Sequence, residues 1–249
     1  MSLKMGLNLA KYYSINFSLP KRRKKIIKFI IIHYTGMKSE NNAIKKLCDH
    51  KSKVSSHYFI KNNGQIINLV PDLYEAWHAG LSSWRKQKFL NKQSIGIEIN
   101  NPGHSNRYTH FSTKQIVVLK KLLKYLIKEY KIKKQNVLGH SDIAPDRKID
   151  PGEKFPWQDL AKKNLCIWHS LNLSKIKRFR KQQINIKSRK NFMRNLYRIG
   201  YSKVKKIGFK KNEIILTKAF QRRFRQDLVN GIIDEECLLI SKKLAKNLK

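Results

Sequence analysis

A short, isoleucine-rich stretch over residues 26–33 limits most strongly what this chain can fold into. Apart from Lys28 the stretch is apolar until His33, and a turn-like Tyr-Thr-Gly follows it. A bounded apolar run of this length is typical of a strand that is buried on both faces. Residues 94–99 form a second strand, in which the three isoleucines share one face and Glu98 points the other way. Both stretches predict strands of a sheet.

Further elements are expected around these two strands. Asn62-Asn63-Gly64 predicts a hairpin turn, because Asn and Gly tolerate positive φ. Ser112 and Gln115 form a capping box at the start of a long helix. The apolar stripe of that helix consists of Ile116, Leu119, Leu123, Leu126, Ile127 and Tyr130. The shorter elements are a helix over residues 43–48 and strands over residues 58–60, 65–70 and 137–139.

The character of the chain changes after about residue 168. Residues 175–211 contain no acidic side chain, and helical patterns occur at residues 191–199, 213–224 and 234–244. Strands that alternate with helices, followed by helices alone, predict an α/β domain and then a helical domain. We expect a basic N-terminal arm at 1–25, the α/β domain at 26–168, a basic linker at 169–189 and a small helical bundle at 190–249.

The charge balance is extreme, since 55 lysines and arginines face 16 aspartates and glutamates in 249 residues, a formal net charge of +39. Nucleic acid, an anionic wall or an anionic membrane would each attract such a chain. The richness in Lys, Ile and Asn also suits an AT-rich genome, although that bias does not explain so few acids. A nucleic-acid-binding protein would interleave basic and stacking aromatic residues in a recognisable module. The sequence shows no such module, so we expect no specific nucleic-acid partner.

Neither a membrane span nor an export signal is evident in the sequence. The longest apolar run is strand-sized, far short of the roughly 18 residues of a membrane helix. Residues 1–19 lack a continuous apolar segment followed by small residues. These features favour the cytoplasm over the alternatives, the periplasm or the cell envelope, and we expect a monomer. The cysteines, Cys48, Cys166 and Cys237, lie too far apart to predict a disulfide framework or a Cys-rich zinc site.

Three positions carry candidate metal chemistry. His33 ends the first strand, His140 follows the strand at residues 137–139, and Asp150 lies in the loop at residues 145–152. Two histidines and one aspartate can hold a catalytic zinc ion with one position left open. The spacing alone leaves the alternative that each histidine is merely hydrogen-bonded.

Five blocks of the sequence resemble, in order, those of the type-2 N-acetylmuramoyl-L-alanine amidases, the family of phage amidase lysozymes and peptidoglycan recognition proteins. The blocks are residues 30–35, 54–60 with Gly64, 76–80 with Ser83 and Trp84, 94–99, and 139–152. The resemblance implies a mixed central sheet flanked by helices. It also implies one zinc ion held by His33, His140 and Asp150, a catalytic glutamate at Glu98 and a catalytic lysine at Lys148.

The residues agree with these roles. Burial would raise the pKa of Glu98 toward the range of a general base, and Lys148 lies close enough to Asp150 in the chain to stabilise an oxyanion. The alternatives are a solvated strand residue and a plain surface lysine. We further expect His57, His78 and Trp84 to contact substrate or the surroundings of the metal, with packing as the alternative for Trp84. The remaining histidines, His50, His104, His110 and His169, are expected at the surface.

Residues 219–225 and 230–234 resemble a small three-helix peptidoglycan-binding domain, although Phe220 and Phe224 would also suit a plain helix-bundle core. The sequence therefore predicts a zinc amidase that cuts N-acetylmuramic acid, or its 1,6-anhydro form, from L-alanine in peptidoglycan or muropeptides. Its C-terminal part is expected to hold the wall without being needed for chemistry. The main alternative, a non-catalytic peptidoglycan-binding module, is disfavoured because both histidines, Asp150, Glu98 and Lys148 are all present.

Overall fold

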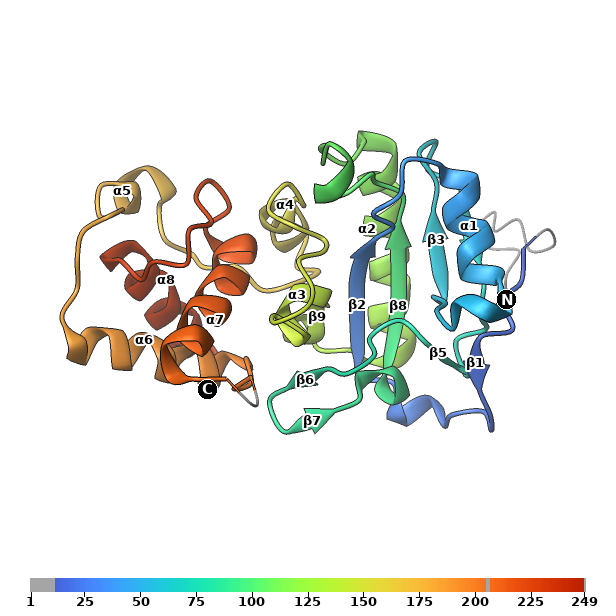
Figure 1. The fold of residues 1–249 in the computed structure, drawn as a ribbon, viewed down its shortest axis with the longest axis horizontal. Coiled ribbons are helices and arrows are strands. Elements are labelled where there is room, and N and C mark those ends of the chain that lie inside the picture. The colour runs from blue at the N-terminus through green and yellow to red at the C-terminus, as the bar shows by residue number, and fades with distance from the viewer. Residues whose placement is uncertain (1–11, 205–206, 249) are drawn as a thin grey trace.

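A five-stranded mixed sheet forms the centre of the molecule (Figure 1). The structure, a computed structural model, describes residues 12–204 and 207–248. The strand order is β4-β3-β8-β2-β9, and only the β3–β4 pair is antiparallel. The strands are β2 (Phe29–Tyr34), β3 (Tyr58–Ile60), β4 (Ile66–Asn68), β8 (Ser94–Ile99) and β9 (Val137–Gly139). The predicted mixed sheet flanked by helices is confirmed.

One face of the sheet packs against α2 (Thr113–Tyr130), which begins at the predicted capping box of Ser112 and Gln115. Isoleucines of β2 and β8 meet its leucines in one core. Leu122 belongs to the buried side of α2, whereas Ile127 and Tyr130 are only half-buried, so the apolar stripe is rotated slightly from the predicted one. On the opposite face, α1 (Glu40–Cys48) covers β3 and β4.

The described part of the N-terminal stretch, from residue 12, packs against the α/β domain. Ser14 and Asn16 are buried, and the Asn16 side chain donates to the Asp49 and Val54 carbonyls at 2.9 and 2.8 Å. The short strand β1 (Phe17–Ser18) pairs with β5 (Glu75–Ala76). Residues 12–25 therefore form part of the α/β domain, and residues 1–11 of the predicted arm lie outside the described residues.

Several short elements complete the α/β domain. They are the hairpin β6 (Ser83–Trp84) and β7 (Gln87–Lys88), the 3-10 turns Lys24–Ile26, His50–Ser52, Leu90–Gln93, His104–Asn106 and Lys134–Asn136, and the helices α3 (His140–Ile143) and α4 (Trp157–Lys162).

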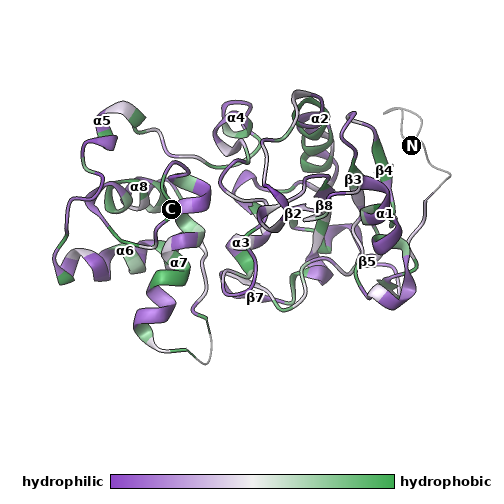
Figure 2. Ribbon diagram, turned by 45° about the horizontal axis from the view of Figure 1, so that its top comes forward, coloured by the Kyte–Doolittle hydropathy of each residue, from purple (hydrophilic) through white to green (hydrophobic). Residues whose placement is uncertain are grey.

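The C-terminal part is helical, as expected. Its main helices are α6 (Ile186–Ile199), α7 (Phe209–Phe224) and α8 (Glu235–Lys246), while α5 (Leu173–Lys177) occupies the stretch predicted as a linker. In Figure 2, α7 shows hydrophilic and hydrophobic residues in turn along its length, as expected of a helix that buries one side. No helix among the described residues has the length and apolar character needed to cross a membrane.

The helical part and the sheet share one hydrophobic core. Phe29 and Ile31 of β2 and Leu138 of β9 belong to the same buried cluster as Phe192 of α6 and Phe220 of α7. The contact is also polar, because Arg223 of α7 pairs with Asp142 of α3 at 2.5 Å. The C-terminal helices therefore cover the β2 and β9 part of the sheet face that lies opposite α2.

Candidate metal centre and active-site cavity

Strand geometry brings the predicted residues together. The parallel strands β2 and β9 are neighbours, so their carboxyl ends meet at one edge of the sheet. His33 lies near the end of β2, and His140 directly follows β9. Glu98 of β8 is in register with His33, which places both side chains on the sheet face away from α2.

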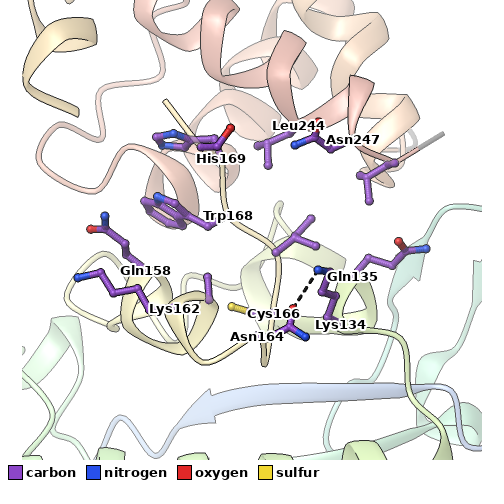
Figure 3. A pocket seen from close by; sticks show the side chains of 14 residues that line it. Lys134, Gln135, Gln158, Lys162, Asn164, Cys166, Trp168, His169, Leu244 and Asn247 are labelled. Carbon is purple, nitrogen blue, oxygen red and sulfur yellow. Dashed lines mark hydrogen bonds between the residues drawn. The ribbon is translucent and has the colours of Figure 1, made fainter. Parts of the chain in front are cut away.

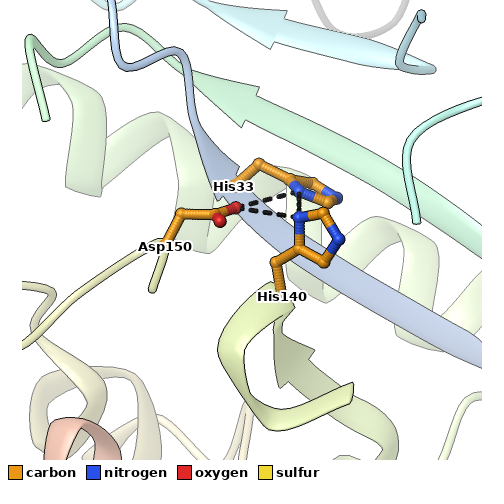
Figure 4. Close-up of side chains that lie close together, drawn as sticks. All are labelled: His33, His140 and Asp150. Carbon is orange, nitrogen blue, oxygen red and sulfur yellow. Dashed lines mark hydrogen bonds and ion pairs between the residues drawn. The ribbon is translucent and has the colours of Figure 1, made fainter. Parts of the chain in front are cut away.

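His33, His140 and Asp150 converge on one point (Figure 4). His33 Nδ1 lies 2.9 Å from His140 Nδ1 and 3.1 Å from Asp150 Oδ2, and His140 Nδ1 lies 3.2 Å from the same oxygen. All three residues are buried. One atom from each residue faces the others, as in a three-ligand catalytic zinc site.

The ionisation of these groups suits a metal. Burial, with His140 close by, lowers the pKa of His33 to about 4. Burial alone would raise the pKa of Asp150, but His140 and His33 outweigh it by charge and hydrogen bonding and hold that pKa below its ordinary value. Metal ligands must be neutral imidazoles and ionised carboxylates. The donor set therefore fits a zinc ion.

Glu98 is half-buried, and one of its carboxyl oxygens is buried without a hydrogen-bond partner in the described part of the chain. Its Oε2 atom contacts no donor among the described residues. Burial, reinforced by the charge of Asp150, raises the pKa of Glu98 to about 8. A carboxyl with a raised pKa in a cleft is suited to move protons.

A cavity of about 350 Å³ joins these residues. The predicted zinc ligands, Glu98, Lys148 and His78 all line it. Arg147 lines it as well, and its guanidinium donates to the carbonyls of Ala79 and Leu81. Arg147 lies within the fifth block, at residues 139–152, and its position next to Lys148 in the chain is the signal that could have indicated a residue for binding an anion.

Two predicted contact residues lie outside the cavity. His57 is buried behind it, where its Nδ1 atom accepts the Gly96 N–H at 2.9 Å and its Nε2 atom lies 3.0 Å from the Tyr74 carbonyl. Trp84 is 1% exposed, and its ring packs edge-on against Tyr201 with centroids 4.9 Å apart. The prediction of a substrate contact for Trp84 is therefore corrected to the packing alternative, because the C-terminal helices cover the indole.

His169 is also corrected. It is 4% exposed and stacks on Trp168. Both residues line a second cavity, of about 400 Å³, between the 3-10 turn Lys134–Asn136, α4 and the end of α8 (Figure 3). The other three histidines of that group, His50, His104 and His110, are exposed as expected.

Comparison with known proteins points to one family of enzymes. The N-acetylmuramoyl-L-alanine amidase family model matches residues 22–153. N-acetylmuramoyl-L-alanine amidase AmiD of Escherichia coli K12 is 37% identical over 233 residues, which cover 88% of this chain and 82% of AmiD. The 1,6-anhydro-N-acetylmuramyl-L-alanine amidase AmpD of Haemophilus influenzae is 39% identical over 110 residues, 44% of this chain and 58% of AmpD.

The solved structures resemble nearly the whole chain. AmiD from E. coli, in complex with the substrate anhydro-N-acetylmuramic acid-L-Ala-D-gamma-Glu-L-Lys, superposes with a TM-score of 0.78 at 34% identity and covers 92% of both chains. AmpDh3 from Pseudomonas aeruginosa, in complex with an anhydromuramic pentapeptide, gives a TM-score of 0.79 at 27% identity over 96% of this chain and 98% of AmpDh3. From the match of the family model, the long alignment with AmiD and the shared fold, we conclude that this chain belongs to the N-acetylmuramoyl-L-alanine amidase family.

Proposed function

We propose that this amidase hydrolyses the bond between 1,6-anhydro-N-acetylmuramic acid and L-alanine in soluble muropeptides, with one zinc ion held by His33, His140 and Asp150. The convergence of these three buried side chains beside Glu98 in one cavity carries the proposal. The anhydromuropeptides bound to AmiD and AmpDh3 support the substrate class.

The bound zinc would polarise the scissile carbonyl and make water nucleophilic at neutral pH. The protein residues do the rest. Glu98 accepts a proton from the attacking water and passes it to the leaving nitrogen of L-alanine. The charge of Lys148 opposes the rise that burial causes in the pKa of Glu98, which favours the carboxylate form that acts as a base. The Lys148 ammonium, which lines the same cavity, stabilises the negative charge that develops on the carbonyl oxygen.

A direct assay tests the proposal. The full chain is incubated with anhydro-N-acetylmuramyl-L-Ala-D-γ-Glu-L-Lys, and mass spectrometry detects the released tripeptide. Treatment with a strong chelator should abolish release, and zinc should restore it. Full release by protein proven free of metal would contradict the zinc assignment, and no release by zinc-loaded protein would favour the non-catalytic binding module.

A further inference from the structure

His78 is held firmly between His33 and strand β8. The backbone N–H groups of His78 and Ala79 both donate to the Asn91 side-chain oxygen, at 3.2 and 2.7 Å. The His78 ring lies on Gly96, where an added Cβ would come within 2.4 Å of the ring. Glycine at position 96 therefore makes the space that the imidazole occupies.

The single proton of the Ser94 hydroxyl determines the tautomer of His78. Ser94 Oγ donates to the Leu90 carbonyl at 2.6 Å, and it also lies 3.1 Å from His78 Nε2. A hydroxyl has one proton to donate. Since that proton goes to the carbonyl, the second contact requires an N–H at His78 Nε2. The Nδ1 atom of neutral His78 is then left with a free lone pair.

The tautomer of His78 in turn determines the tautomer of His33 in the candidate metal centre. His78 Nδ1 lies 3.0 Å from His33 Nε2, so His33 must donate its N–H there. His33 Nδ1 is then unprotonated and faces His140 and Asp150. His140 is constrained in parallel, because its Nε2 atom lies 3.2 Å from the Ala79 carbonyl, which can only accept. Its Nδ1 atom is likewise left unprotonated.

We propose that His78 and Ala79 are positioning residues that set the tautomer of both metal-binding histidines, His78 through the Ser94 hydroxyl and Ala79 through its carbonyl. The inference rests on the proposed zinc function. Metal ligands depend on such outer hydrogen bonds for orientation and basicity, and their loss costs on the order of 10–100-fold in metal affinity. His78 acts through His33 in this scheme, whatever it also contributes to the cavity wall.

Zinc affinity of the full chain, measured by competition with a chromophoric chelator, tests the inference without an activity readout. His78→Leu removes the acceptor for His33 and should weaken zinc binding on the order of 10–100-fold. His78→Asn should recover most of the affinity, because its amide oxygen can replace Nδ1 as the acceptor. Ser94→Ala should give a smaller loss. His110→Leu, at an exposed histidine outside the cavity, is the matched control and should leave affinity unchanged.

Nitrogen-15 NMR of the imidazoles of the unmodified chain, with and without zinc, reads the tautomers directly. His78 should carry its proton on Nε2 in both states. A proton on Nδ1 of His78, wild-type affinity in His78→Leu, or equal losses in His78→Leu and His78→Asn would overturn the inference. If the wild-type chain itself fails to bind zinc, the proposed function fails instead, while the tautomers in metal-free protein still decide the hydrogen-bond scheme.

Discussion

Glu98 and Asp150 are two carboxyls of the same cavity whose pKa values are shifted in opposite directions. Burial and the charge of Asp150 raise the pKa of Glu98 to about 8, whereas His140 and His33 hold that of Asp150 below its ordinary value. Environments that separate two pKa values in this way assign different roles to similar groups. Asp150 is suited to bind a cation and Glu98 to exchange protons.

Substitution of these residues should separate chemistry from metal binding. Glu98→Gln should leave one zinc per chain and lower turnover on the order of 10²–10⁴-fold, the usual contribution of a general acid–base group. His140→Ala should lose both zinc and turnover, because it removes one of three protein ligands. Zinc stoichiometry by elemental analysis is paired with release of the L-alanine-headed peptide. Wild-type turnover in Glu98→Gln would show that Glu98 is only a structural residue.

Lys148 calls for a separate test, because lysines are common in this chain. Lys148→Met should keep zinc and lower turnover by roughly 10²–10³-fold if the ammonium stabilises the oxyanion. Lys86→Met, at a lysine that does not line this cavity, is the control. The two rates are measured at saturating substrate, so that a change confined to KM is recognised and counts against the oxyanion role.

The buried histidines predict a loss of stability in acid. Burial, with Arg22 nearby, lowers the pKa of His57 from 6.5 to about 3. Between these values the unfolded chain binds a proton that the folded chain excludes, so His57 makes stability fall as pH falls, by at most about 1.4 kcal/mol per pH unit. Urea unfolding of metal-free protein from pH 6.5 to 5 should show a shallower slope for His57→Gln and an unchanged slope for His110→Gln. Equal slopes for His57→Gln and the wild type would refute this assignment.

At the scale of elements, local patterns were sufficient for β2, β8 and α2. The apolar runs of the strands and the capping box of α2 are properties of neighbouring residues, and the structure confirms each of them. Local patterns could not predict whether the Trp84 side chain is buried or contacts substrate. Its burial depends on Tyr201 and Gly200, which lie more than a hundred residues further along the chain. That His33, His140 and Asp150 form one metal site could be predicted only from the resemblance to a family. Spacing alone left open whether each histidine is a ligand or is merely hydrogen-bonded.

The capping box itself is a testable element. Ser112 Oγ accepts the Gln115 N–H at 3.2 Å, and the Gln115 side chain accepts the Ser112 N–H at 3.0 Å. Ser112→Ala should lower the free energy of unfolding by about 1 kcal/mol, and Ser112→Asp should preserve it. Urea denaturation measures both variants. Equal stability of Ser112→Ala and the wild type would mean that tertiary packing alone holds the start of α2.

At the scale of the whole molecule, a buried ion pair links the C-terminal helices to the segment that carries the candidate ligand His140. Asp142 lies two residues after His140, and its carboxylate accepts hydrogen bonds from Arg223 of α7, the Tyr201 hydroxyl and the Gly139 N–H. Arg223 also donates to the Val137 carbonyl and stacks over Trp157 at 4.2 Å. Residues of the C-terminal part of the chain therefore stabilise the position of the segment that carries His140.

Removal of the Arg223 guanidinium should destabilise the folded protein. Arg223→Met leaves the buried Asp142 carboxylate without its positively charged partner, which should lower the free energy of unfolding by about 3–5 kcal/mol. Arg194→Met changes an exposed arginine of α6 and serves as the control, with little effect expected. Thermal unfolding of the zinc-loaded protein compares the two. If Arg223→Met is as stable as Arg194→Met, the ion pair does not stabilise the contact between the C-terminal helices and the α/β domain.

The same contacts decide what a truncation after residue 170 would do. The sequence suggested that the C-terminal part is dispensable for chemistry, yet its loss exposes Phe29, Ile31 and Leu138 and removes both Arg223 and Tyr201. A buried sheet face opened to water costs about 25 cal/mol for each Å² of apolar surface. We therefore expect residues 1–170 to be insoluble or unfolded and to bind zinc weakly, as judged by circular dichroism and chelator competition. A folded, active truncation would restore the view of the C-terminal helices as a separable module, and pelleting with purified sacculi would then measure its contribution to wall attachment.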